Sequence, residues 1–393
     1  MFLWNNFTND ARVTREAKSL AKNGYQVNII CKKEKDEMDL LSKESFQSGY
    51  TATRLYKTEI PNFIIKRFNN KKIKTLLSKH LPNGFLMLKM IRQGFKDNSD
   101  VYHSHDLNTL IQGVVCAKFR QDKKILVFDS HEVNTSRTNY NIKIVGIVEK
   151  ILLRFVDKTI VENDTRGRYH ELLYGIKPVS LHNYSELYNI DNVVPINLYK
   201  VFNIIPKKIF LYQGGLQAGR GLEQLIHSFH DANIDAYLFF VGDGKLRAKL
   251  QQLVHQLNMN EKVFFTGRVP YMELRSYTKS AYVGFQILQK VNFNHYSASS
   301  NKLYEYMMAH IPVIATNMPE IKNVVEKENI GIVIEENNQD QLTKAIIQLY
   351  NDESLHEKYK ENMSVAKEKY NWSKEQKVLL DFYNEIFEVN ASE

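Results

Sequence analysis

The sequence predicts an α/β protein made of two doubly wound domains, each a parallel sheet with helices on both faces. The chain has 393 residues, which favours two domains at roughly 150 residues per domain. Apolar strand-like runs alternate with helical patterns in both halves, as in parallel sheets covered on both faces. Residues 189–206 separate the two runs, show no clean period and contain two prolines, so they are the expected linker.

The first half begins with a short strand, Met1 to Trp4, and a polar loop. Apolar residues at helical spacing follow and end at Gly24, which suits a left-handed helix cap. The further strand-like runs of this half are residues 25–31, 101–104, 125–128, 159–161 and 179–181.

The second half alternates more regularly. Its predicted strands are residues 209–213, 237–241, 263–266, 282–288, 312–315 and 331–334. Helical faces lie between them, and only helices are expected after residue 340. We predict an N-terminal domain over 1–188, the linker over 189–206, a second domain over 207–370, and a helix over 371–393 that packs back on the first domain. Ligands are expected in the cleft between the domains, beyond the carboxyl ends of the strands.

The composition is that of an ordinary globular protein, with 43% apolar and 25% charged residues. No apolar stretch reaches the roughly 20 residues of a membrane span, and the start lacks the pattern of a signal peptide. Cys31 and Cys116 form no metal-type spacing and are expected to be buried and reduced. A cytoplasmic protein is therefore expected.

The net charge of +9 lies entirely in the first half. Residues 1–200 hold 32 basic and 21 acidic side chains, whereas residues 201–393 hold 21 and 23. Residues 54–96 alone hold eleven Lys and Arg against one acid, interleaved with apolar side chains. This segment suits an anionic membrane surface at the inner face of the plasma membrane. The alternative is a core-facing helix with a solvated basic face. No recognition module accompanies the charge, so nucleic acid is not expected as a partner.

A glycine-rich loop follows the first strand of the second half (212–221, YQGGLQAGRG). Glycines between a strand and a helix let backbone N–H groups approach a phosphate, and Arg220 adds a permanent positive charge. Neither the P-loop nor the dinucleotide pattern fits this loop. The alternative is a glycine-rich turn with a solvated arginine.

A second candidate phosphate site lies at residues 297–306 (SASSNKLYEY). Ser299 and Ser300 are natural N-caps, and Asn301 and Lys302 fall in the first helical turn. Glu305 lies on nearly the same face, where a carboxylate can accept hydrogen bonds from ribose hydroxyls. The alternative is a surface helix with a Lys–Glu pair.

Two histidines flank Ser104 at the end of a predicted strand, so His103 and His105 point to the same face. Three interpretations stay open for them: a metal site completed by His131 and Glu132, a structural histidine pair, or a contact of His105 with a sugar. Because the residues after His105 do not continue a known metallo-hydrolase pattern, no metal is expected.

The ordered motifs resemble the family 4 glycosyltransferases, retaining enzymes of the GT-B fold. The donor half of that family is similar to residues 212–222 (YQGGLQAGRGL), 241–244 (VGDG), 265–269 (FTGRV) and 301–316 (NKLYEYMMAHIPVIAT). The acceptor half is similar to residues 9–27 (NDARVTREAKSLAKNGYQV), 100–106 (DVYHSHD), 128–132 (FDSHE) and 174–179 (YGIKPV). The resemblance covers almost the whole chain.

The resemblance implies transfer of a hexosyl group from a nucleoside-diphosphate sugar, UDP- or GDP-linked, without cofactor or metal, to a glycan, lipid-linked or other cell-envelope acceptor. It implies three catalytic residues, His105, Arg220 and Lys302. The donor would be bound by Gly214, Gly215, Arg220, Ser297, Asn301, Lys302 and Glu305. The acceptor side would use Asn9, Asp10 and His131.

Two donor positions depart from the family pattern. Gly215 stands where the family has an arginine, and Ser297 stands where it has the first of two glutamates. Arg220 replaces the usual lysine and keeps the charge. These departures motivate one alternative, a non-catalytic GT-B partner of another glycosyltransferase. A second alternative, a nucleotide-sugar 2-epimerase of the same fold, lacks evident acid-base residues.

Overall fold

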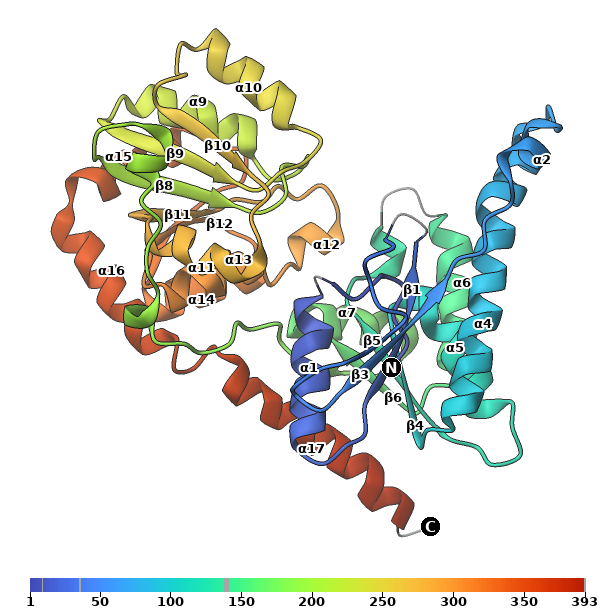
Figure 1. Cartoon of the computed structure of the whole chain (residues 1–393). Helices are drawn as coiled ribbons and strands as arrows, with labels where there is room; N and C mark the ends of the chain where they lie inside the picture. The colour runs from blue at the N-terminus through green and yellow to red at the C-terminus, as the bar shows by residue number, and fades with distance from the viewer. Residues whose placement is uncertain (9, 35–36, 138–140, 392–393) are drawn as a thin grey trace. The chain divides into compact units, whose positions relative to one another are not determined.

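The computed structural model describes residues 1–8, 10–34, 37–137 and 141–391, which form two compact units (Figure 1). Unit 1 contains Met1–Leu181 and Val378–Glu393, and unit 2 contains His182–Lys377. The division therefore falls at residue 181, before the expected boundary at 188. The expected linker, 189–206, lies within unit 2, because Ile190 and Leu198 are buried in that unit's core. Helix α17 (Trp372–Ala391) begins in unit 2 and ends in unit 1.

The strands of unit 1 form one sheet that a single residue holds together. Phe2 bridges Ile30 and Ser104, so it joins the group β2-β3-β1 to the group β4-β5-β6-β7. Its N–H donates to His103 O at 2.7 Å, and its carbonyl accepts from His105 N at 3.1 Å. The expected first strand is thus one bridging residue. All pairs are parallel except β2 with β3. The strands are β1 (Asn28–Lys33), β2 (Lys43–Ser45), β3 (Thr51–Tyr56), β4 (Val101–His105), β5 (Ile125–Ser130), β6 (Lys158–Val161) and β7 (Val179–Ser180).

The helices of unit 1 include one column that continues without a break from α3 into α4. A π-helical turn, Leu76–His80, joins these two helices. The others follow the strand–helix alternation that the sequence predicts. They are α1 (Ala11–Lys22), α2 (Asn62–Lys66), α3 (Lys71–Thr75), α4 (Leu81–Asp97), α5 (Leu107–Lys118), α6 (Ile142–Leu153) and α7 (Asp164–Tyr174).

Unit 2 is a six-stranded parallel sheet in the order β10-β9-β8-β11-β12-β13. The chain winds one way from β8 to β10 and the other way from β11 to β13, so the topology switches between β8 and β11. Ligands of doubly wound sheets bind at such a point, beyond the strand ends. The strands are β8 (Lys208–Gln213), β9 (Ala236–Val241), β10 (Val263–Gly267), β11 (Val283–Gln286), β12 (Val313–Thr316) and β13 (Gly331–Ile334).

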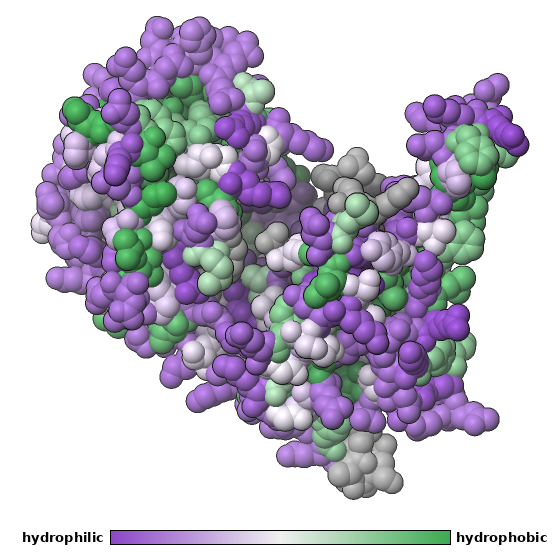
Figure 2. All heavy atoms as spheres, viewed as in Figure 1, coloured by the Kyte–Doolittle hydropathy of each residue, from purple (hydrophilic) through white to green (hydrophobic). Residues whose placement is uncertain are grey.

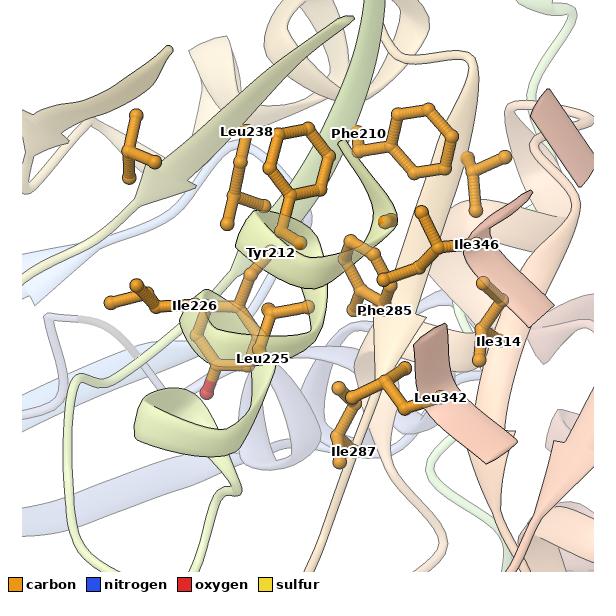
Figure 3. Close-up of a cluster of buried hydrophobic side chains, with 14 of the residues drawn as sticks. Phe210, Tyr212, Leu225, Ile226, Leu238, Phe285, Ile287, Ile314, Leu342 and Ile346 are labelled. Carbon is orange, nitrogen blue, oxygen red and sulfur yellow. The ribbon is translucent and has the colours of Figure 1, made fainter. Parts of the chain in front are cut away.

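Helices cover both faces of the unit 2 sheet. Phe210 and Tyr212 pack on one face with α9 and α15, as Figure 3 shows, whereas Ile209 and Leu211 pack on the other. This two-sided burial explains the continuous apolar runs of the strands. The helices are α8 (Leu198–Phe202), α9 (Leu222–Ala232), α10 (Arg247–Gln256), α11 (Tyr271–Lys279), α12 (Phe293–Tyr296), α13 (Asn301–Met308), α14 (Pro319–Glu328), α15 (Gln339–Asn351) and α16 (Glu353–Ala366).

Two helical glycines of unit 1 give a test of the packing. A Cβ at Gly113 of α5 would overlap Ser104 Oγ and lie 2.6 Å from Leu126 Cδ1, whereas a Cβ at Gly84 of α4 meets open space. Gly113→Ala is expected to destabilise the protein by about 1–3 kcal/mol. Gly84→Ala should be neutral or stabilising by up to about 1 kcal/mol. Urea unfolding of both variants checks this, and equal stability of the two would contradict the packing of α5 on the sheet.

Candidate functional site

The glycine-rich loop after β8 is held by direct backbone contact with the loop after β9. Gly214 N donates to Val241 O at 2.8 Å, and Leu216 N donates to Asp243 O at 3.0 Å. A Cβ at Gly242 would overlap Gly214 O, and a Cβ at Gly244 would overlap Leu216 O. Only glycine allows this approach. The VGDG motif therefore fixes the position of the loop at the switch point of the sheet.

Two positive charges lie beside this loop. The Lys302 side chain comes from the first turn of α13, is only 6% exposed, and places Nζ 5.0 Å from the centre of the Tyr212 ring. A Cβ on Gly214 would lie 3.7 Å from Nζ, so the ammonium group borders the loop. Arg220 is the second charge, and its Nε is buried without a hydrogen-bond partner in the described part of the chain.

Lys302 has no carboxylate within ion-pair distance among the described residues. Burial, and next the positive charge of Arg220, hold the pKa of Lys302 well below its ordinary value, while Glu305 opposes that shift. Two neighbouring cations, of which Lys302 is buried and Arg220 half-buried, outnumber the one carboxylate beside them and favour a bound polyanion. Ser300 caps α13 without a side-chain hydrogen bond, which leaves the first-turn N–H groups of Asn301 and Lys302 for such a ligand.

Glu305 lies one turn further along α13 and is held in place by a chain of hydrogen bonds. Its Oε2 accepts from Gln213 Nε2 at 2.5 Å, and Gln213 Oε1 accepts from Thr278 Oγ1 at 2.8 Å. The carboxylate lines a pocket of unit 2 together with Ser185, Tyr188, Leu274, Arg275 and Thr278. Glu305 is thus an oriented acceptor at the edge of a pocket.

The two departures from the family pattern have different surroundings. Ser297 is buried, and its Oγ donates to Phe293 O at 2.8 Å at the end of α12. Gly215 faces the side chain of Gln217. Neither position brings a charge to the loop. His295 of α12, which no sequence motif indicated, lies against Gly219, and burial lowers the pKa of His295.

Unit 1 brings a second polar cluster together at the carboxyl ends of β4 and β5. His105 and Asp129 are register partners, and His105 Nδ1 lies 3.3 Å from Asp129 Oδ2. His131 Nε2 lies 3.0 Å from the same oxygen and 3.1 Å from His105 Nδ1. Arg12 of α1 binds Asp129 through two bonds of 2.9 Å and also donates to Leu181 O.

The charges of this cluster depend on one another. Burial opposes ionisation of Asp129, but Arg12 and His131 outweigh it and hold the pKa of Asp129 well below its usual range. Burial likewise opposes protonation of His131, but Asp129 and Asp106 raise its pKa to about 10. The His105 side chain is fully buried, whereas that of His131 is 20% exposed. His131 is therefore the histidine of this pair that solvent reaches in unit 1.

The remaining acceptor-side candidates are placed as follows. Asp10 is the N-cap of α1, where Oδ1 accepts from Val13 N at 3.1 Å and Oδ2 accepts from Asn5 at 2.8 Å. Asn9 lies outside the described residues.

Residues 200–365 match the family model described as glycosyl transferases group 1. The matched region lies within unit 2 and covers less than half of the chain.

The chain is 25% identical to a glycosyltransferase of Methanocaldococcus jannaschii over 242 residues, 58% of this chain and 66% of that protein. It is 23% identical to the N-acetylgalactosamine-N,N'-diacetylbacillosaminyl-diphospho-undecaprenol 4-alpha-N-acetylgalactosaminyltransferase of Campylobacter jejuni, over 57% of this chain and 59% of that one. The chain thus spans just under two thirds of these curated relatives.

A solved structure shows the same fold along nearly the whole chain. Anabaena HepE in complex with UDP and glucose matches with a TM-score of 0.74 at 12% identity, over 98% of each chain. The predicted GT-B fold, with two Rossmann-like units, is confirmed.

Several residues that build these sites were missed by reading the sequence. Gln213 and Thr278 orient Glu305, while Arg12 and Asp129 organise the histidines. Gln213, Arg12 and Asp129 stand inside motifs that carry the family resemblance, which is the signal that could have found them. Thr278 has no such signal, because it reaches the site from α11 only through folding.

The Arg12–Asp129 pair gives a stability test. Arg12→Ala leaves Asp129 buried without its two-bond partner and is expected to destabilise the protein by about 3–5 kcal/mol. The control is Lys158→Ala, which breaks an exposed pair with Glu385 and should cost less than about 1 kcal/mol. Urea unfolding measures both, and a loss below about 1 kcal/mol for Arg12→Ala would contradict the buried pair.

Proposed function

We propose that this chain is a retaining glycosyltransferase that moves a hexosyl group from a nucleoside-diphosphate sugar to a cell-envelope, lipid-linked or polysaccharide acceptor. The observation that carries the proposal is the pair of neighbouring cations, Lys302 and Arg220, at the switch point of the unit 2 sheet. A buried ammonium group without a carboxylate partner is costly unless a ligand neutralises it. A diphosphate supplies the negative charge that neutralises this ammonium group.

In this proposal Arg220, Lys302 and the first turn of α13 bind the diphosphate, and Gly214 lets the loop backbone approach it. Glu305, oriented by Gln213, accepts hydrogen bonds from the ribose hydroxyls. The two cations also stabilise the negative charge that develops on the leaving diphosphate. No cofactor or metal ion is assigned to this step, because the side chains provide the positive charge. The HepE structure supports a UDP-type donor, since it contains UDP and glucose.

The catalytic role that the resemblance implies for His105 stays a prediction. Because the His105 side chain is buried, we propose that it acts by positioning His131 through their 3.1 Å contact, and that His131 and Asp10 serve the acceptor side. The Campylobacter relative is named for a diphospho-undecaprenol substrate, which supports a lipid-linked acceptor. We place the protein at the cytoplasmic face of an envelope membrane.

Removal of the Lys302 charge tests the donor site. Lys302→Met is expected to bind UDP or GDP at least tenfold more weakly, because a charge-assisted contact is worth about 1.5–3 kcal/mol. The free variant should be at least as stable as the wild type, since it loses a buried charge without a carboxylate partner. Titration calorimetry with UDP, GDP and ADP measures the affinity, and Lys327→Met, at an exposed position of the same unit, is the control.

The same titrations also measure the uptake of protons by the protein on ligand binding. The pKa of Lys302 is lowered in the free protein, and a bound diphosphate raises it, so binding takes up protons while the pH lies between these two values. Affinity therefore falls as the pH rises through that range. Calorimetry over a series of pH values, in buffers of different ionisation enthalpy, should show a pH range of proton uptake for the wild type that Lys302→Met lacks. Unchanged affinity of both Lys302→Met and Arg220→Ala would reject the site. Tight donor binding without turnover on varied acceptors would favour the non-catalytic partner instead.

We also propose an anionic membrane surface as partner, bound through the exposed side of α2, α3, α4 and α6. No helix within the described residues is long and apolar enough to cross a bilayer. Figure 2 shows apolar side chains along the α2–α4 column. The exposed apolar residues of the surface are Phe63, Phe68, Ile73, Leu76, Leu81, Phe85, Leu88, Ile142, Ile144, Ile147 and Ile151. Arg54, counted in the basic segment, is not part of it, because it is buried and pairs with Glu44 at 2.7 Å.

Charge reversal tests this surface. Each Lys near an anionic membrane is worth about 1 kcal/mol, so the double change Lys71→Glu and Lys72→Glu on α3 should weaken binding by at least about thirtyfold. The control is Lys344→Glu with Lys358→Glu, both exposed in unit 2. Flotation with vesicles containing phosphatidylglycerol at low salt measures binding. Equal flotation of the two double variants, or none by the wild type, would contradict the proposal.

A further inference from the structure

Asp106 has a backbone conformation that residues other than glycine rarely adopt. It follows β4 directly, and its φ of 63° and ψ of 162° lie in a region that is nearly confined to glycine. Other residues that end helices with a positive φ lie in the ordinary left-handed region, which asparagine tolerates. These residues are Asn98, Asn203, Asn233 and Asn329. The conformation of Asp106 is therefore a local strain of a different kind.

Hydrogen bonds on both sides of Asp106 hold this conformation in place. Asp106 N donates to Asp129 O at 2.9 Å, and Asp106 O accepts from Thr109 N at 3.1 Å. The buried hydroxyl of Thr109 also donates to His105 O at 2.7 Å. Strained residues persist only where the surrounding structure enforces them, and they gather at functional sites.

The side chain of Asp106 does not act as a helix cap, although an aspartate at the start of a helix usually does. Asp106 is the N-cap of α5, but its carboxylate accepts no hydrogen bond from the first turn. Instead, Oδ2 lies 3.0 Å from Arg137 Nη2, and Oδ1 is covered without a hydrogen-bond partner among the described residues. Both the backbone and the carboxylate thus give up a favourable local arrangement.

The Asp106 carboxylate lies at the same edge of the unit 1 sheet as His131. These residues follow the neighbouring strands β4 and β5, whose register pairs His105 with Asp129. Burial opposes protonation of His131, but the charges of Asp129 and Asp106 raise its pKa to about 10. The side chain of Asp106 is 24% exposed and that of His131 is 20% exposed, so one ligand can reach both.

Asp106 can accept a further hydrogen bond, whereas its polar neighbours are committed. The positively charged imidazolium of His131 only donates. The Asp129 carboxylate is fully buried against Arg12. Both oxygens of Asp10 already accept hydrogen bonds around the start of α1. A carboxylate offers about four acceptor positions, so one ion pair leaves Asp106 able to bind a hydroxyl group.

We infer that Asp106 is an acceptor-binding residue: its carboxylate accepts a hydrogen bond from a hydroxyl of the sugar acceptor, while His131 donates one to a neighbouring oxygen. This inference rests on the proposed function and names the group by which the acceptor is recognised, a pair of adjacent sugar oxygens. Rotation about the Cβ–Cγ bond exchanges the two carboxylate oxygens, so either one reaches the exposed side. A charged acceptor of this kind is stronger than a neutral one.

Two variants test the backbone on which the inference depends. Asp106→Gly and Asp106→Ala both remove the carboxylate, but only glycine adopts this conformation freely. The glycine variant is expected to melt about 2–6 °C above the alanine variant. The control is Asp164, exposed in the first turn of α7, where the alanine variant should melt at least as high as the glycine variant. The same order at both positions would overturn the inference.

Transfer by the full-length protein tests the carboxylate. The probes are UDP-glucose as donor and the octyl glycosides of glucose, galactose and N-acetylglucosamine as acceptors. Asp106→Asn and Asp106→Gly should each lower kcat/KM for the acceptor at least about tenfold, because a charged hydrogen-bond acceptor is lost. Their affinity for UDP should equal that of the wild type, since the donor site lies in unit 2.

Glu132→Gln is the matched control, because Glu132 Oε2 is the other carboxylate oxygen on Arg137, at 2.9 Å from Nε. Its transfer rate should equal that of the wild type. Equal losses in the Glu132 and Asp106 variants would assign the effect to Arg137 and overturn the inference. Wild-type kcat/KM in Asp106→Asn would overturn the inference alone. A wild type that binds UDP but transfers to none of these acceptors would contradict the proposed function, and the inference with it.

Discussion

Parallel pairing of the strands is the constraint on which both sites depend. It brings the carboxyl ends of neighbouring strands to one edge of each sheet, where polar side chains from distant parts of the chain meet. In unit 1 the register places His105 beside Asp129. In unit 2 the switch between β8 and β11 opens the edge where the glycine loop and Lys302 meet.

The two units differ in the charge balance at these edges. Unit 2 gathers two cations beside one oriented carboxylate, so positive charge is in excess there. In unit 1 the positive charges of Arg12 and His131 lie against the carboxylate of Asp129. The excess positive charge of unit 2 costs folding free energy, and a diphosphate is a ligand that relieves it.

The glycine contacts show how backbone geometry serves the chemistry of unit 2. Gly214, Gly242 and Gly244 allow two loops to touch through their backbones, which leaves the space above the sheet edge to Lys302 and Arg220. A side chain at Gly242 or Gly244 would push the loops apart. The positions of Lys302 and Arg220 therefore depend on glycine residues that carry no charge.

Much of this protein was determined by its sequence alone. Apolar periodicity predicted every strand of unit 2 and most strands of unit 1, because burial on both faces of a parallel sheet leaves a strong local pattern. It missed β2 and β3 of unit 1. The loop motif and the helix at 301–308 located Arg220, Lys302 and Glu305, since glycine spacing and capping residues are local signals as well.

The tertiary structure decided what local patterns cannot carry. Phe2 joins the unit 1 sheet as one bridging residue, too short to show a period, and residues 189–206 fold into unit 2 because distant side chains bury them. The orientation of Glu305 by Gln213 and Thr278, the burial of Lys302, and the meeting of Asp106 with Arg137 all join residues far apart in sequence. Long-range packing sets these contacts, so only the folded chain reveals them.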